Sequence, residues 1–188
     1  MIEKIDTAPH DEYDKALIFA LKKWIADEIN NIYDNGVYAV CLTMEKGEKW
    51  QAGIGYSTEA FAKAGGSKWN ICGWKCPDFS NADNDGAVDG MIDMWLDFKG
   101  FGKVNEDDVK DGYFRCAAQA VKELTADFII KERFNRNIPF LLVSDREEMS
   151  VIHNSPGAGG KALRTAAFTM TANPEGLIDE SFYEMCGV

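Results

Sequence analysis

Apolar and polar residues follow a helical or an alternating period along most of the chain, and this pattern predicts its elements. Between Asp11 and about Asp34, apolar residues recur at steps of three and four, which predicts an amphipathic helix capped by Asp11 and ended by Asn35-Gly36. The buried stripe predicted for this helix contains Tyr13, Leu17, Ala20, Leu21, Trp24, Ile25, Ile29, Ile32 and Tyr33. Residues 1–10, before the helix, are expected to form a loose arm.

A β-hairpin is predicted next. Residues 37–44 are apolar on both faces and should be covered on both sides, whereas residues 49–56 alternate and should be buried on one face. Ser57 or Thr58 is expected to cap a short helix from Glu59 to Ala64, which Gly65-Gly66 ends. A third strand near residues 69–74 is one interpretation of the irregular, tryptophan-rich stretch that follows.

Two further helices are predicted before the most apolar strand. Residues 88–99 have an inward stripe, and a long helix begins near Glu106 or Asp107 and ends near Phe134. The stripe of residues 88–99 is Val88, Met91, Ile92, Trp95 and Leu96, and that of the long helix is Val109, Tyr113, Cys116, Ala117, Ala120, Val121, Leu124, Phe128 and Ile129. The chain then enters residues 138–145, a short apolar run between polar turns, which predicts a buried strand at the centre of a single sheet.

The predicted elements indicate one domain over residues 1–188. The sequence contains no internal repeat and no linker. We therefore expect an α+β fold in which the N-terminal helix and the long central helix pack on a mostly antiparallel sheet.

Charge and composition narrow the range of functions. The chain has 188 residues, 46% of them hydrophobic, and a net charge of −11 from 31 acidic and 20 basic side chains. Such a length can bury a core without metal or disulfides, so the domain is expected to fold without metal. The negative charge disfavours nucleic-acid binding, because phosphates are repelled, and favours basic protein partners.

We expect a cytoplasmic protein, because the sequence shows no pattern typical of a segment that targets or anchors a protein. The start of the chain lacks a basic region followed by an apolar one, and no window approaches the length of a membrane span, so we expect neither a signal peptide nor membrane insertion. The five cysteines (Cys41, Cys72, Cys76, Cys116 and Cys186) are scattered and odd in number, which indicates reduced thiols.

The segment from Asn81 to Asp89 resembles a calcium-binding loop. Oxygen-bearing side chains stand at Asn81, Asp83, Asp85 and Asp89, with a glycine at the sixth position. Position twelve is Ile92, where such a loop needs a bidentate glutamate. We therefore expect a polar loop that caps the next helix, with these four residues as weak metal candidates, and we assign no cofactor.

Other motifs are incomplete. The spacing of Cys72 and Cys76 suits neither a redox pair nor a four-ligand zinc site. Residues 155–162 resemble a phosphate loop but lack its first glycine and its magnesium-binding hydroxyl, so a flexible loop is the default interpretation. A pair of Cys41 or Cys116 with His153 has no local support, and we assign no catalytic residue.

The stretch between residues 69 and 89 is predicted to face a partner. Trp69, Trp74 and Phe79 lie in irregular polar sequence close to Asp83, Asp85 and Asp89. Exposed aromatic rings can anchor a partner, and carboxylates can steer a basic one, so these six residues form the predicted interface.

The layout resembles family 4303 of the bacterial domains of unknown function. The resemblance covers roughly residues 11–175. It is carried by the N-terminal helix, the strand at residues 37–42, the helix start at residues 57–59, the tryptophan-rich middle and the long helix that leads into residues 140–145. This chain departs from the family in its glycine loop at residues 156–160, and the family implies no catalytic residues.

Two classes of function remain open. Small acidic cytoplasmic proteins of this kind resemble bacterial immunity proteins, which neutralise a toxin by binding it, so a non-enzymatic interaction domain with a basic toxin as partner is the leading expectation. The alternative is an enzyme, or a protein that binds a metal or small ligand, with an acidic site near Asp83, Asp85 and Asp89 or at Asp145. An interaction domain should expose an acidic and aromatic patch, whereas an enzyme should gather titratable groups in a cleft.

Overall fold

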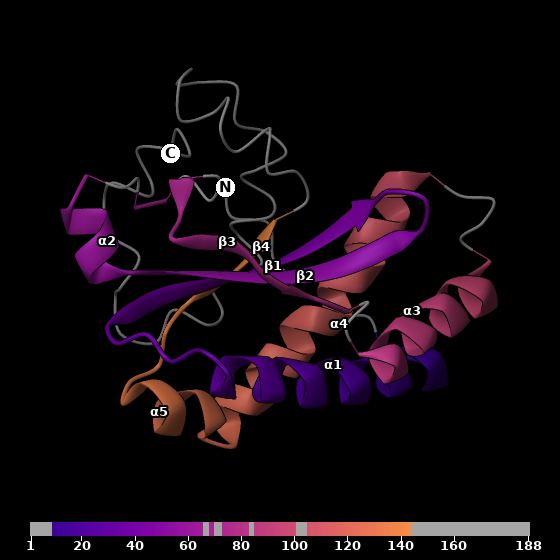
Figure 1. The fold of residues 1–188 in the computed structure, drawn as a ribbon. Helices are drawn as coiled ribbons and strands as arrows, with labels where there is room; N and C mark the ends of the chain where they lie inside the picture. Colours follow the sequence, from indigo (N-terminus) through magenta and orange to yellow (C-terminus); the bar gives the residue numbers. More distant parts are fainter. Residues whose placement is uncertain (1–8, 66–67, 70–72, 83–84, 101–104, 144–188) are drawn as a thin grey trace, which may run out of the picture.

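The computed structural model describes residues 9–65, 68–69, 73–82, 85–100 and 105–143. The elements in chain order are α1 (Glu12–Asn30), β1 (Val37–Lys46), β2 (Trp50–Thr58), α2 (Glu59–Lys63), β3 (Cys76–Asn81), α3 (Gly86–Lys99), α4 (Glu106–Ala126), α5 (Ile129–Phe134) and β4 (Phe140–Val143). Helices α1, α3, α4 and α5 gather along one side of the sheet (Figure 1), which confirms the predicted α+β class and the packing of α1 and α4.

The sheet has four strands in the order β3-β2-β1-β4. The β1–β2 and β2–β3 pairs are antiparallel, whereas β4 runs parallel to β1, with Val40 beside Phe140. All eight residues from Val37 to Met44 are buried, so β1 is covered on both faces as its sequence predicts. β1 is the spine of the sheet because it has strand neighbours on both edges.

The expectation that the strand at residues 138–145 occupies the centre of the sheet is wrong for the described strands. β4 stands at the end of the strand order, and β1 is the only described strand beside it. The apolar character of β4 reflects burial at that edge, since Phe140, Leu141 and Leu142 are at most 2% exposed. A short apolar run indicates burial but does not say on how many edges a strand is paired.

One hydrophobic core joins the helices to the near face of the sheet. Alternate residues of β1, β2 and β4 point into it, and α1, α3 and α4 each contribute one stripe. The largest fully buried side chains are Trp24, Trp95, Tyr113, Phe114 and Phe140, followed by leucines and isoleucines of α1 and β1. The helix stripes predicted from the sequence are therefore correct over most of their length.

Three boundaries differ from those predicted. α1 ends at Asn30, so Tyr33, which was placed on the buried stripe, is 87% exposed. The long helix is two helices, because Phe128 adopts a left-handed backbone (φ 62°) that ends α4 and turns the chain into α5; its ring is 61% exposed. The third described strand occupies residues 76–81, while residues 70–72 of the predicted strand lie outside the described residues.

Three of the five cysteines lie in the described part of the chain. Cys41, Cys76 and Cys116 are free thiols, as predicted, while Cys72 and Cys186 lie outside the described residues. Among the helices described here, none combines the length and apolar composition needed to cross a membrane.

Gly55 marks a close approach of three strands, which gives a prediction. A Cβ atom at this position would lie 2.2 Å from the carbonyl oxygen of Pro77 and 2.9 Å from Sγ of Cys41. Gly55→Ala should therefore lower the free energy of unfolding by about 2–3 kcal/mol, as overpacking does, in a urea titration.

Gly90 provides the matched control. A Cβ atom there meets nothing within 4 Å, and α3 continues through the site. Gly90→Ala should stabilise the protein by about 0.5–1 kcal/mol through helix propensity. Equal effects of the two alanines would contradict the close approach at Gly55.

Candidate functional site

The two tryptophans predicted to face a partner are buried. Trp69 and Trp74 are each 3% exposed and pack edge-on around Tyr38, with ring centroids 5.5 and 6.0 Å from its ring. The Trp74 indole N–H donates to the carbonyl oxygen of Lys68 at 2.9 Å, and the Tyr38 hydroxyl donates to the same oxygen. The expectation of exposed tryptophan anchors is therefore wrong, because irregular, polar sequence around these rings does not prevent them from forming a small core of their own.

The remaining predicted interface residues are dispersed. Phe79 is half-buried against Tyr56, with ring centroids 5.1 Å apart. Asp85 caps α3 by accepting from the backbone N–H groups of Ala87 and Val88, as the loop interpretation predicts.

Asp89 pairs with Lys49 at 2.6 Å. Asn81 ends β3, while Asp83 and Asp145 lie outside the described residues. The carboxylates of Asp85 and Asp89 thus have structural partners.

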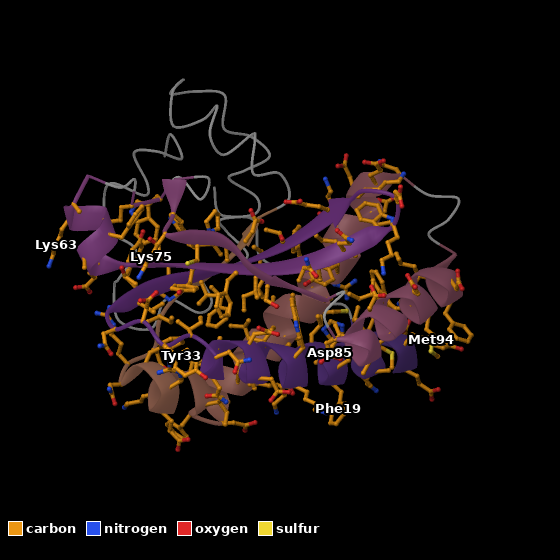
Figure 2. All side chains as sticks on the ribbon, viewed as in Figure 1. Phe19, Tyr33, Lys63, Lys75, Asp85 and Met94 are labelled. Atoms are coloured by element: carbon orange, nitrogen blue, oxygen red, sulfur yellow. The ribbon has the colours of Figure 1, made fainter. Side chains whose placement is uncertain are left out.

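A different acidic and aromatic surface lies where α1 meets α3. Tyr13, Met94 and Phe98 are 40%, 53% and 56% exposed. The Tyr13 and Phe98 rings stack with centroids 4.0 Å apart and planes 19° from parallel. The exposed carboxylates of Glu12, Asp93 and Asp97 adjoin these side chains in sequence, and we name the six residues the α1/α3 patch. Figure 2 shows Met94 at the outer side of α3.

A buried carboxylate holds the two helices in this arrangement. Asp14, only 6% exposed, accepts from the Trp95 indole N–H at 2.9 Å and lies 2.9 Å from Nζ of Lys99, both on α3. Lys99 also donates to Asp11, the residue that caps α1. Asp11 and Asp14 form a reciprocal capping box, so one cluster begins α1 and ties it to the last turn of α3.

Asp14 and Lys99 each stabilise the ionised form of the other. Burial, the largest single influence, opposes ionisation of Asp14, but the hydrogen bonds from Trp95 and Lys99 outweigh it and hold the pKa of Asp14 below its ordinary value. Burial likewise opposes the charge of Lys99, yet its bonds to Asp11 and Asp14 raise the pKa of Lys99. The pair therefore remains ionised at neutral pH.

Two more side chains approach Asp14 from outside α3. Ligand atoms of His10, Asp14 and Cys116 lie within 4.8 Å of one another, and this is the cluster in the described part of the chain that could hold a metal ion. Burial and then the charge of Asp14 raise the pKa of the Cys116 thiol above its ordinary range, and Cys116 is 1% exposed. A buried, protonated thiol is unsuited to nucleophilic attack, although these residue types occur together in cysteine hydrolases.

A groove of about 830 Å³ runs between α1 and α4. Lys22 crosses it to pair with Asp127 at 2.6 Å and Glu123 at 3.4 Å, and Phe19 of α1, 73% exposed, lies on its wall. The two carboxylates that line the groove are thus engaged by Lys22 in ion pairs, which is an arrangement that a structural contact between α1 and α4 explains.

Sequence reasoning missed the α1/α3 patch for an identifiable reason. The helical stripe of residues 11–34 placed Tyr13 inside the core, whereas Met94 and Phe98 fell outside the inward stripe of residues 88–99. Large apolar residues off a buried stripe were the available signal of a surface patch.

No family model, curated protein or solved structure matches this chain. Its function is therefore inferred from its own surface and charge.

The charge of Asp14 gives a prediction for acid unfolding. Its pKa in the folded state lies below the ordinary value of 3.8, so the stability it contributes is complete above that pH and is lost as the pH falls through the folded pKa. Trp95→Phe removes a donor while the carboxylate stays buried, which raises the pKa of Asp14. The midpoint of acid unfolding should move to higher pH. The free energy of unfolding at pH 7 should fall by about 1.5–3 kcal/mol, because the hydrogen bond to a charged group is lost.

Trp24→Phe is the control for ring volume. Trp24 is 1% exposed, and its indole nitrogen is buried without a hydrogen-bond partner among the described residues. This variant should lose packing alone and leave the acid midpoint close to that of the parent once the stability difference is subtracted. Circular dichroism across a pH series measures both, and equal corrected shifts would refute the role of the Trp95–Asp14 bond.

Proposed function

We propose that this protein is a non-enzymatic interaction domain that presents the α1/α3 patch to a basic protein partner. The observation that carries the proposal is the exposed stack of Tyr13 on Phe98, extended by Met94 and adjoined by acidic residues. Aromatic and methionine side chains are enriched at protein interfaces, where they supply most of the buried anchor area.

The stack is suited to binding because it is ordered before a partner arrives. Tyr13 is held by the first turn of α1 and Phe98 by the last turn of α3, and the Asp14–Trp95 and Asp14–Lys99 contacts tie these turns together. Rings that are already fixed lose less side-chain freedom on binding, which leaves more of the contact energy for affinity.

The charge of the molecule favours a basic partner. Glu12, Asp93 and Asp97 are exposed carboxylates next in sequence to the patch rings or to Met94, and the whole chain carries a net charge of −11. Such a field speeds association with a positively charged surface and suppresses association with phosphates.

The finer assignment is that of a bacterial, cytoplasmic immunity protein that neutralises a basic toxin. It is supported by the acidic charge, the small size and the layout that resembles family 4303, together with the exposed patch. The competing enzyme hypothesis loses support at Asp85 and Asp89, because a helix cap and an ion pair already engage these carboxylates.

Binding kinetics against the product of the adjacent gene test the proposal. Phe98→Ala removes the more exposed ring of the stack, so it should raise the dissociation rate at least tenfold, as the loss of a central anchor does. The double variant Asp93→Asn, Asp97→Asn should instead slow association, and this effect should shrink when salt is raised from about 0.05 to 0.5 M, because salt screens the charges.

Tyr33→Ala is the matched control. Tyr33 is 87% exposed beyond the C-terminal end of α1, whereas Tyr13 lies in its first turn, and Figure 2 shows Tyr33 on the other side of the view from Met94. Its removal should therefore leave both rates unchanged. The proposal fails if the patch variants, shown to be folded by circular dichroism, bind and protect cells from the toxin as well as the parent does.

A further inference from the structure

The His10–Asp14–Cys116 cluster brings three kinds of metal ligand to one point. His10 precedes the cap of α1, Asp14 lies in its first turn, and Cys116 comes from the middle of α4. An imidazole nitrogen, a carboxylate oxygen and a thiolate sulfur are the donors that zinc takes in proteins. Helix packing brings these residues together from separate parts of the chain, so no local sequence motif predicts the cluster.

The His10 side chain has an unexplained atom in this cluster. Its Nδ1 is buried and has no hydrogen-bond partner among the described residues. The nearest charged atom, Oδ2 of Asp14, lies 3.7 Å away, which is too long for a hydrogen bond. A buried ring nitrogen that faces a carboxylate without a hydrogen bond needs an explanation. An ion bound between the two atoms would provide one.

The spacing also suits an ion. Bonds of about 2.0–2.3 Å at tetrahedral angles separate neighbouring ligand atoms by about 3.3–3.6 Å. The 3.7 Å between His10 Nδ1 and Asp14 Oδ2 is already close to this separation, and the 4.8 Å limit for the whole cluster sets a contraction of at most about 1.5 Å. His10 lies outside the helix and is the residue best placed to adjust.

The Asp14 carboxylate can serve the ion without giving up its role in the fold. Oδ1 accepts from the Trp95 indole and lies 2.9 Å from the Lys99 ammonium, whereas Oδ2 faces His10 and also accepts from the backbone N–H of Asp11 at 3.4 Å. The α3 contacts thus orient the carboxylate from behind, as second-layer hydrogen bonds do for metal ligands. Lys99 is shared with Asp11, which offsets its repulsion of a cation.

We propose that His10 Nδ1, Asp14 Oδ2 and Cys116 Sγ bind one divalent zinc-like ion, with a fourth position open toward the groove that His10 lines. Binding releases the proton of the Cys116 thiol to solvent and forms an Sγ–metal bond, so that the ion, the carboxylate and the thiolate are together neutral. Three protein ligands with an open position are typical of exchangeable or catalytic zinc sites, and a side chain of a bound partner or a water would complete the shell. The rest of the core does not depend on the ion, since its members other than Cys116 are side chains spread mainly over α1, α3, α4, α5, β1, β2 and β4.

Cobalt(II) is the probe, because a tetrahedral site with a thiolate ligand gives intense visible bands and a near-ultraviolet sulfur-to-metal band. Reduced protein titrated with cobalt alone should develop both bands with one ion per chain, and zinc should abolish them. Cys116→Ala should remove the sulfur band, and His10→Ala, outside the helix, should weaken binding at least roughly 10–100-fold.

Cys41→Ala is the thiol control, since Cys41 is buried in β1 and is not part of the cluster. It should keep the cobalt bands, and zinc should raise the Tm of the parent and of this control but not that of His10→Ala. The absence of bands in the parent, or bands unchanged in Cys116→Ala or His10→Ala, would overturn the site. These readouts involve no protein partner, so they stand or fall separately from the interaction proposal.

Discussion

The buried carboxylate of Asp14 is the constraint on which this end of the molecule depends. A charge that is 6% exposed is tolerated only because an indole N–H, a lysine ammonium and the N-terminal turn of α1 meet it. Those partners come from α3 and from the cap of α1, so satisfying the charge fixes how the two helices meet. The Tyr13–Phe98 stack on the outside is a consequence of that contact, whereas the approach of Cys116 to His10 also requires the packing of α4 against α1.

The sheet supplies the frame behind these helices. β1 is buried along eight successive residues and has a strand on each side, so its position is determined by both faces and both edges. Its inward side chains pack in one core with the stripes of α1 and α4, which leaves the opposite sides of these helices facing solvent. A surface on a packed helix pair holds its rings more precisely than a loop would, which is the physical basis of the proposed role of the α1/α3 patch.

Local patterns predicted the elements because burial imposes a period on each one. The stripes of α1 and α4 are correct over most of their length, β1 is apolar on both faces as expected, Asp11 caps α1, and Thr58 is the one of the two predicted residues that caps α2. Prediction failed where tertiary packing decides. The edge position of β4, the left-handed Phe128 and the burial of Trp69 and Trp74 around Tyr38 depend on partners that are distant in sequence or on a single backbone angle. The α1/α3 patch and the His10–Asp14–Cys116 cluster are built between elements, so no single stretch of sequence contains them.

A double-mutant cycle on Asp14 and Trp95 tests the central claim most directly. The free energy of unfolding is measured for the parent, Asp14→Ala, Trp95→Phe and the double variant, so that losses of packing and of the capping box cancel. A charged, buried hydrogen bond at 2.9 Å predicts a coupling energy of about 1.5–3 kcal/mol. Additivity within about 0.5 kcal/mol would show that the two side chains do not act together, and would contradict the account.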